Sequence, residues 1–163
     1  MHNTPVNIYL ACTVRGDRGA VTVLRQVADL LETAGHTVLT RHLLEDNVDS
    51  AESALSEREV FARDMQWLTT ADVLIAEASG SSYGVGFEVG YVLGKSDHTA
   101  QRVLLLYDEA RRPAISRLVV GTDHPRCTVH SYERVVDLPP VITRFLSDKE
   151  VPADVPRTRP DWL

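Results

Sequence analysis

One short apolar segment, followed by a loop of small residues, most constrains how this chain can fold. Residues 71–76 (ADVLIA) are too few to cross a membrane and include β-branched side chains, so they predict a central parallel strand covered on both faces. The next loop, residues 80–86 (GSSYGVG), leaves backbone N–H groups free at the start of a helix, where an anionic ligand is favoured. Sites in α/β folds lie at the carboxyl ends of strands. We therefore expect the functional site here, between Asp64 before the strand and Glu88 after it.

The rest of the chain alternates between strand-like and helix-like segments. Strands are predicted at residues 7–12, 36–43, 71–76, 102–107 and 127–132, the last at the sheet edge. Helices are predicted at residues 20–34, 56–70, 84–95, 114–120 and 133–147, the last interrupted by Pro139 and Pro140. Residues 44–56 are expected to be the longest loop. This alternation predicts an α/β fold: a three-layer, flavodoxin-like or Rossmann-like sandwich with a five-stranded parallel sheet.

Length and charge narrow the classes of protein further. A chain of 163 residues can form one domain with its own core, and we assign residues 1–147 to it. Residues 148–163 contain several prolines and almost no apolar period, so an extended or disordered tail is expected there. The net charge of -6 argues against a nucleic-acid polymer as partner, because binding its backbone requires a basic face.

The cysteines and the first residues of the chain bear on its compartment. Cys12 and Cys127 lack any metal-ligand spacing, and we expect both to be small buried hydrophobes in a reducing compartment. The N-terminal MHNTPVN lacks the charged and hydrophobic regions of a signal peptide. We expect a cytoplasmic protein without a membrane partner.

Most catalytic and cofactor motifs are missing. Gly84, Gly86 and Gly90 differ in spacing from a dinucleotide fingerprint and follow the third strand rather than the first. A P-loop lysine, a nucleophile elbow and a histidine metal cluster are also missing, so no cofactor or metal is expected. Asp64 and Glu88 remain, and paired carboxylates can cleave a glycosidic bond: one attacks or stabilises the anomeric carbon while the other protonates the leaving group.

The two carboxylates, and three further polar or aromatic residues near the predicted site, also have simpler structural interpretations. Glu88 could serve only to complement the helix dipole, and Asp64 could be a helix cap or a surface partner. Tyr9 could be a core aromatic whose hydroxyl needs a partner. Arg15 could be a surface charge and His42 a structural histidine near the end of the second strand.

Three segments, taken in order and spacing, point to a known family. YLACTVRG, DMQWLTTADVLIAE and SYGVGFEVG resemble the motifs of the nucleoside 2-deoxyribosyltransferase superfamily, and are most similar to its 2'-deoxynucleoside 5'-phosphate N-hydrolase branch. The resemblance covers residues 7–146. It implies that Glu88 attacks C1' to form a covalent glycosyl-enzyme intermediate, that Asp64 assists protonation of the departing base, and that Tyr9 orients Glu88.

The resemblance also implies how a nucleoside 5'-monophosphate is held. The phosphate would contact two loops and a short helix: Thr13, Arg15, Gly16, Ser82, Gly84 and Ser116. In the family the last of these serines typically comes from a neighbouring subunit, which implies a homodimer with Ser116 shared across the interface.

Two finer expectations concern the carboxylates and the base. A nucleophile near a helix N-terminus is expected to have a depressed pKa and the acid a raised one. Val14, His42 and residues 44–56 are candidates for lining the base pocket, although the sequence does not identify the base. Tyr9 favours 2'-deoxy substrates, because relatives that cleave CMP often have phenylalanine at its position.

The sequence thus predicts a hydrolase that cleaves the N-glycosidic bond of a (2'-deoxy)nucleoside 5'-monophosphate, giving free base and (deoxy)ribose 5-phosphate. A nucleoside deoxyribosyltransferase, a CMP-type ribonucleotide N-glycosidase and a nucleotide-binding sensor without turnover are the alternatives.

Overall fold

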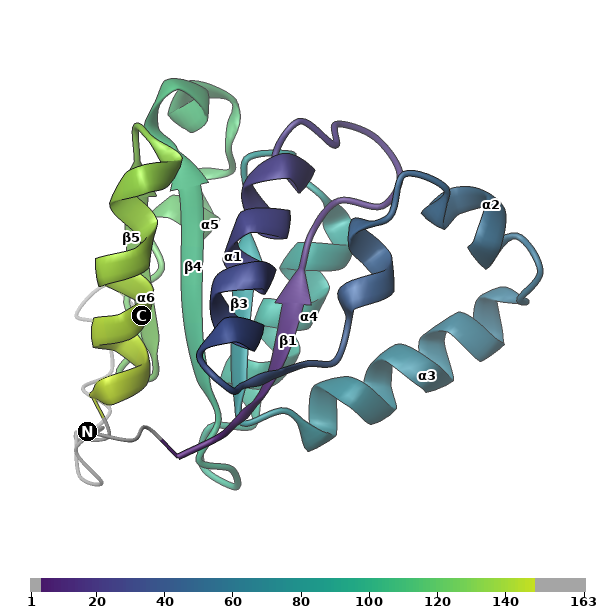
Figure 1. Cartoon of the computed structure of the whole chain (residues 1–163), viewed down its shortest axis with the longest axis horizontal. Coiled ribbons are helices and arrows are strands. Elements are labelled where there is room, and N and C mark those ends of the chain that lie inside the picture. The colour runs from purple at the N-terminus through teal and green to yellow at the C-terminus, as the bar shows by residue number, and fades with distance from the viewer. Residues whose placement is uncertain (1–3, 149–163) are drawn as a thin grey trace, which may run out of the picture.

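Five parallel strands form one sheet in the order β2-β1-β3-β4-β5 (Figure 1). Our computed structural model describes residues 4–148. The strands are β1 (Asn7–Ala11), β2 (Thr37–Val38), β3 (Val73–Glu77), β4 (Arg102–Asp108) and β5 (Cys127–Tyr132). The α/β class and the edge position of β5 are confirmed. The assignment of residues 149–163 to a tail lies outside the described residues, and the domain boundary stays a prediction.

Helices cover both faces of the sheet (Figure 1). The helices are α1 (Val21–Thr33), α2 (Val48–Glu52), α3 (Glu57–Thr70), α4 (Tyr83–Gly94), α5 (Arg117–Val120) and α6 (Leu138–Ser147). Three 3-10 helices accompany them in the described residues: η1 (Arg41–Leu44), η2 (Glu109–Ala114) and η3 (Val135–Asp137).

Successive side chains along each strand point to opposite faces of the sheet, and this divides the core into two halves. Ile8 and Leu10 of β1 pack with α1 and α6, whereas Tyr9 and Ala11 pack with α3 and α4 on the opposite face. β1 and β3 are adjacent in register, with Tyr9 opposite Leu74. The chain leaves these two strands toward opposite sides of the sheet, and ligands bind at such switch points.

The strand predicted at residues 36–43 was wrong beyond its first few residues. Thr40 donates its hydroxyl to the carbonyl oxygen of Leu10 (2.7 Å) and accepts from the Leu10 amide (2.9 Å). This side chain occupies the position of a strand partner for β1, so the chain leaves the sheet after Val38 and forms η1. His42 therefore lies on η1 rather than on a strand.

Two other expectations need correction. Residues 44–56 are not a continuous loop, because they contain α2. Pro139 and Pro140 do not interrupt a helix but occupy the first turn of α6, where a missing N–H costs no hydrogen bond. The helix predicted from Ser56 is confirmed, with the Ser56 and Glu59 capping box complete.

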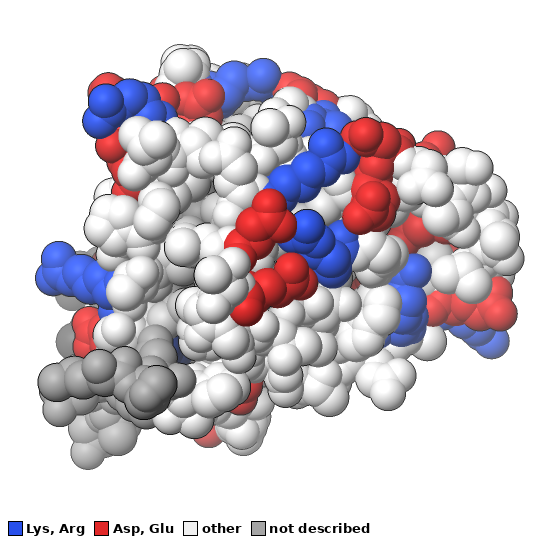
Figure 2. Space-filling view, viewed as in Figure 1, with Lys and Arg blue, Asp and Glu red and all other residues white. Residues whose placement is uncertain are grey.

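Surface charge is mixed on the face that carries α1. Basic and acidic side chains alternate there (Figure 2), and two of the ion pairs are Arg25 with Asp46 and Arg41 with Asp29. Among residues 4–148, every helix is too short or too polar to cross a bilayer.

Candidate active site

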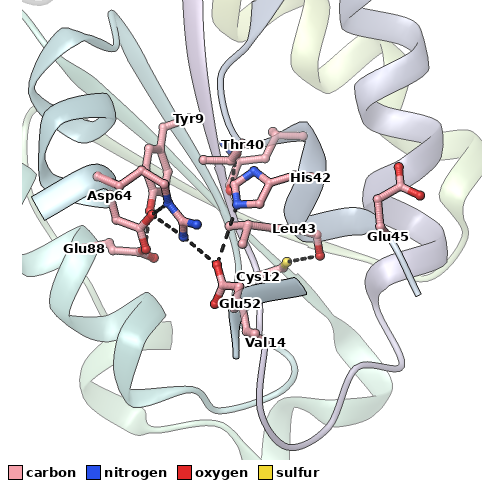
Figure 3. Close-up of polar contacts among 12 residues, drawn as sticks. Tyr9, Cys12, Val14, Thr40, His42, Leu43, Glu45, Glu52, Asp64 and Glu88 are labelled. Carbon is pink, nitrogen blue, oxygen red and sulfur yellow. Dashed lines mark hydrogen bonds and ion pairs between the residues drawn. The ribbon is translucent and has the colours of Figure 1, made fainter. Parts of the chain in front are cut away.

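Tyr9 and Glu88 meet at the centre of the site (Figure 3). Tyr9 lies in the middle of β1 with its side chain fully buried toward α4, and its hydroxyl donates a 2.5 Å hydrogen bond to Oε1 of Glu88. Burial and the neighbouring Glu88 charge raise the pKa of Tyr9 well above its usual range, so the phenol keeps its proton. One oxygen of Glu88 is thereby held in a fixed direction.

Glu88 is a partly buried carboxyl on α4. Its pKa is raised to about 7: burial raises the pKa most, the hydrogen bond from Tyr9 lowers it, and the nearby charge of Asp64 raises it. The expected depression of this pKa was therefore wrong. Glu88 lies in the second turn of α4, where the helix dipole has faded, and loss of hydration dominates.

Asp64, on α3, lies beside Glu88 (Figure 3). Its Oδ1 accepts hydrogen bonds from Nε of Arg63 at 2.8 Å and lies 2.8 Å from Nη2 of the same residue. Burial raises the pKa of Asp64, against the effect of Arg63. The raised pKa expected for the acid is thus confirmed in direction.

A charged and aromatic wall lies next to Asp64, and the sequence indicated it only in part, through His42 and residues 44–56 as base-pocket candidates. Nη2 of Arg63 lies 2.5 Å from Oε1 of Glu52 on α2, and the guanidinium stacks over Trp67, 5.0 Å from the ring centroid. The ring of His42 lies 5.0 Å from that of Trp67, with Nε2 3.6 Å from Glu52. Burial lowers the pKa of His42, followed in effect by the charge of Arg63.

One local signal could have indicated part of this wall. Arg63 and Trp67 are four residues apart on a predicted helix, a spacing that places side chains on one face. Glu52 lies within residues 44–56, a candidate for the base pocket, but nothing singled it out because α2 was not predicted. Of the candidates for the base pocket, His42 and residues 44–56 meet through Glu52, and Val14 appears on the same side of the site in the view of Figure 3.

The loops after β1 and β3 touch each other. Gly16 has φ +111°, which favours glycine. A Cβ on Gly80 would lie 2.3 Å from Oγ1 of Thr13 and 2.6 Å from the carbonyl oxygen of Asp17, so only glycine fits there. The buried Thr13 and the start of α4 are therefore close in space.

The remaining phosphate candidates lie around these loops. Ser82 caps α4 by accepting from the Val85 amide at 3.4 Å, and Gly84 lies in the first turn. Ser116 precedes α5 and lines, together with Ser82, a hollow of about 750 Å³. The side chain of Arg15 is 79% exposed and pairs with Asp49 at 3.3 Å.

Other polar groups in this region have structural partners. Arg18 donates to the carbonyl oxygens of Thr13 (3.2 Å), Leu43 (3.1 Å) and Glu45 (3.1 Å), which ties the loop after β1 to η1. Cys12 is buried as expected, and burial raises the pKa of its thiol to about 11, whereas Cys127 is only half-buried. Among the described residues, no group of three or more His, Cys, Asp or Glu side chains could hold a metal ion.

The sequence of the chain is similar to those of several N-hydrolases. A family model described as nucleoside 2-deoxyribosyltransferase matches residues 8–138. A protein of Thermofilum pendens named as a 2'-deoxynucleoside 5'-phosphate N-hydrolase is 39% identical over 116 residues, which are 71% of this chain and 78% of the relative. The 5-hydroxymethyl-dUMP N-hydrolase of Danio rerio is 31% identical over 78% of this chain and 87% of its own.

A solved structure has the same fold. The CMP N-glycosidase of Clostridium botulinum superposes with a TM-score of 0.58 at 15% identity, covering 85% of this chain and 98% of that one. At this identity the similarity concerns the fold alone.

Proposed function

The chain belongs to the nucleoside 2-deoxyribosyltransferase family, and on that premise we propose that it hydrolyses the N-glycosidic bond of 2'-deoxynucleoside 5'-monophosphates. The products are a free base and deoxyribose 5-phosphate. The observation that carries the proposal is the carboxylate pair of Glu88 and Asp64, with Glu88 held by the buried Tyr9. The relatives named as N-hydrolases of 5'-phosphates support the choice of reaction and substrate.

In the first step Glu88 acts as the nucleophile. Its ionised carboxylate attacks C1' and forms a C1'–O bond while the C1'–N bond breaks. The electron pair of that bond leaves with the base, which takes a proton from Asp64. Tyr9 directs one oxygen of Glu88 and leaves the other for the attack.

In the second step water resolves the intermediate. Asp64, now ionised, takes a proton from the water while the water oxygen bonds to C1'. The C1'–O bond to Glu88 breaks, which frees its carboxylate and deoxyribose 5-phosphate. Asp64 holds the proton again at the end, so the cycle balances without a cofactor.

We place the 5'-phosphate at the adjoining loops after β1 and β3. The N–H groups at the start of α4, the hydroxyl of Ser82 and the exposed Arg15 can neutralise and orient a dianion. Thr13, Gly16 and Gly84 shape this cradle. Binding energy from the phosphate would then fix C1' against Glu88.

We also propose that the protein is a homodimer in which Ser116 reaches the phosphate of the partner subunit. Tyr83 and Leu118 are 99% and 85% exposed beside the hollow that Ser116 lines, and Phe87 is exposed there too. Exposed apolar side chains gathered around a hollow are typical of a protein interface. The cytoplasmic location expected from the sequence stays a prediction.

Chromatography of the protein incubated with dNMPs, NMPs and the matching nucleosides tests the function. We expect free base from a deoxynucleoside monophosphate, little from its nucleoside, and none from Glu88→Ala, because the nucleophile is missing. Full turnover by Glu88→Ala would contradict the mechanism. Incorporation of an added free base would instead indicate the transferase, and preference for NMPs the ribonucleotide enzyme. Binding without product would indicate a sensor.

A further inference from the structure

Arg63 contacts only one of the two oxygens of Asp64. Nε and Nη2 of Arg63 both lie 2.8 Å from Oδ1, whereas no hydrogen bond from the described residues reaches Oδ2. Two nitrogens of a planar guanidinium on one oxygen define the rotation of the carboxyl plane better than a single donor does. Oδ2 is therefore the oxygen left to carry a proton.

Arg63 is itself immobilised on its other sides. Its Nη2 also pairs with Glu52 at 2.5 Å, and its plane lies over Trp67 at 5.0 Å. The side chains of Arg63 and Glu52 are only 21% and 13% exposed, so water screens this pair less than a surface ion pair. Such a side chain can hold its neighbour in one orientation.

We propose that Arg63 is a positioning residue that fixes the Asp64 carboxyl so that Oδ2 delivers its proton to the departing base. The inference rests on the proposed hydrolase function. Arg63 touches neither C1' nor the base nitrogen in this scheme and acts through Asp64. Glu52 holds Arg63 and thereby links α2 to the acid.

The same contacts set the protonation of the site. Charged and ionisable groups face Asp64 from several elements: Arg63 on α3, Glu52 on α2, His42 on η1, Glu88 on α4 and Tyr9 on β1. Arg63 and His42 lower the pKa of Asp64, and Glu52 raises it, against a background of burial that raises it most. Glu88, with its pKa raised to about 7, is the more basic carboxyl of the pair. The pair can hold its single proton in two ways, and the reactive form is the one with Glu88 ionised and the proton on Asp64.

A double-mutant cycle with Arg63→Gln and Asp64→Asn tests whether Arg63 acts through Asp64. We expect kcat of Arg63→Gln to fall about tenfold or more with little change in KM, because a misdirected acid slows the step after binding. The double variant should be no slower than Asp64→Asn alone. Losses that multiply would overturn the proposal, as would a change confined to KM.

The pH profile supplies a readout that a merely structural role would not move. Two carboxyls must share one proton for turnover, so the acid limb of kcat/KM follows the lower pKa, that of Asp64. We expect this limb to move to higher pH in Arg63→Gln, which loses a positive charge, and to lower pH in Glu52→Gln, which loses a negative one. Arg63→Lys keeps the charge without the fork, so kcat should fall while the limb stays. Unchanged limbs in both Gln variants would refute the inference.

Two controls separate this inference from the proposed function. Arg58→Gln alters an exposed arginine of the same helix and should match the wild type in kcat, KM and pH profile. Wild-type protein that releases no base from any monophosphate would refute the function itself. If the wild type is active but the losses of kcat in the two single variants multiply in the double variant, only the role of Arg63 is refuted.

Discussion

The hydroxyl of Tyr9, in the middle of a buried strand, lies 2.5 Å from Oε1 of Glu88, a residue 79 positions later in the chain. This contact joins the two halves of the site, since β1 supplies the donor and α4 the acceptor. A rigid strand aims the hydroxyl, and the carboxylate cannot rotate without breaking the bond. Orientation of a nucleophile by a buried neighbour is a direct source of rate.

Replacing Tyr9 by Phe tests the value of this hydrogen bond. The bond lowers the pKa of Glu88, so its loss should raise that pKa and leave the nucleophile less ionised and less well aimed. We expect kcat to fall about tenfold, with the basic limb of kcat/KM displaced to higher pH. Steady-state kinetics across pH would check both, and an unchanged kcat would contradict the orienting role.

The pH dependence of the wild type follows from the shared proton. With Glu88 the more basic carboxyl, the pair loses its last proton near its pKa of about 7. We therefore expect kcat/KM to fall as pH rises through about 7, because the acid is then missing, and to fall again at lower pH, because the nucleophile is protonated. A rate that keeps rising to pH 9 would contradict this scheme.

Replacing Glu88 should stabilise the protein even though it removes the activity. Its pKa is raised in the folded protein from 4.5 to about 7, so the folded state binds the proton more tightly than the unfolded state. The stabilising effect is complete below about pH 4.5 and is lost as pH rises through about 7. We expect Glu88→Gln to raise the free energy of unfolding at pH 8 by about 1–3 kcal/mol and to change it little at pH 4. Urea unfolding at the two pH values measures this, and equal effects would contradict it.

Ser82 is expected to serve both the helix and the substrate. Ser82→Ala removes the cap on the Val85 amide and should cost about 1 kcal/mol of stability. It should also raise KM for the monophosphate, because a phosphate donor is lost. Ser116→Ala, which removes no side-chain cap, is the matched control for stability. Thermal unfolding and KM for both variants separate the two effects.

Leu118 provides a test of the proposed dimer. Leu118→Glu places a charge in the exposed apolar surface beside Ser116 and should shift the protein to monomers. If Ser116 acts across the interface, KM for the monophosphate should rise in parallel. Sedimentation velocity and kinetics at matched concentrations would show this, and a wild type that is monomeric throughout would contradict the proposal.

Local patterns predicted much of the fold. The capping box of Ser56 and Glu59 marked the start of α3, and the apolar segment at residues 71–76 marked β3. Both signals lie within a few residues of the structure they cause. The position of Asp64 and Glu88 around β3 also suggested their pairing, whereas the role of Tyr9 came from a resemblance to a family; the structure brings these three together.

Contacts between distant segments decided the rest. The sequence by itself determined the order of strands and helices, because apolar periodicity and caps act over a few residues. Only the tertiary structure decided that Thr40 ends β2, that Arg63 joins Asp64 to Glu52, and that the pKa of Glu88 is raised rather than lowered. The physical reason is that burial and ion pairing depend on which side chains meet after the sheet and helices have packed, which no local spacing specifies.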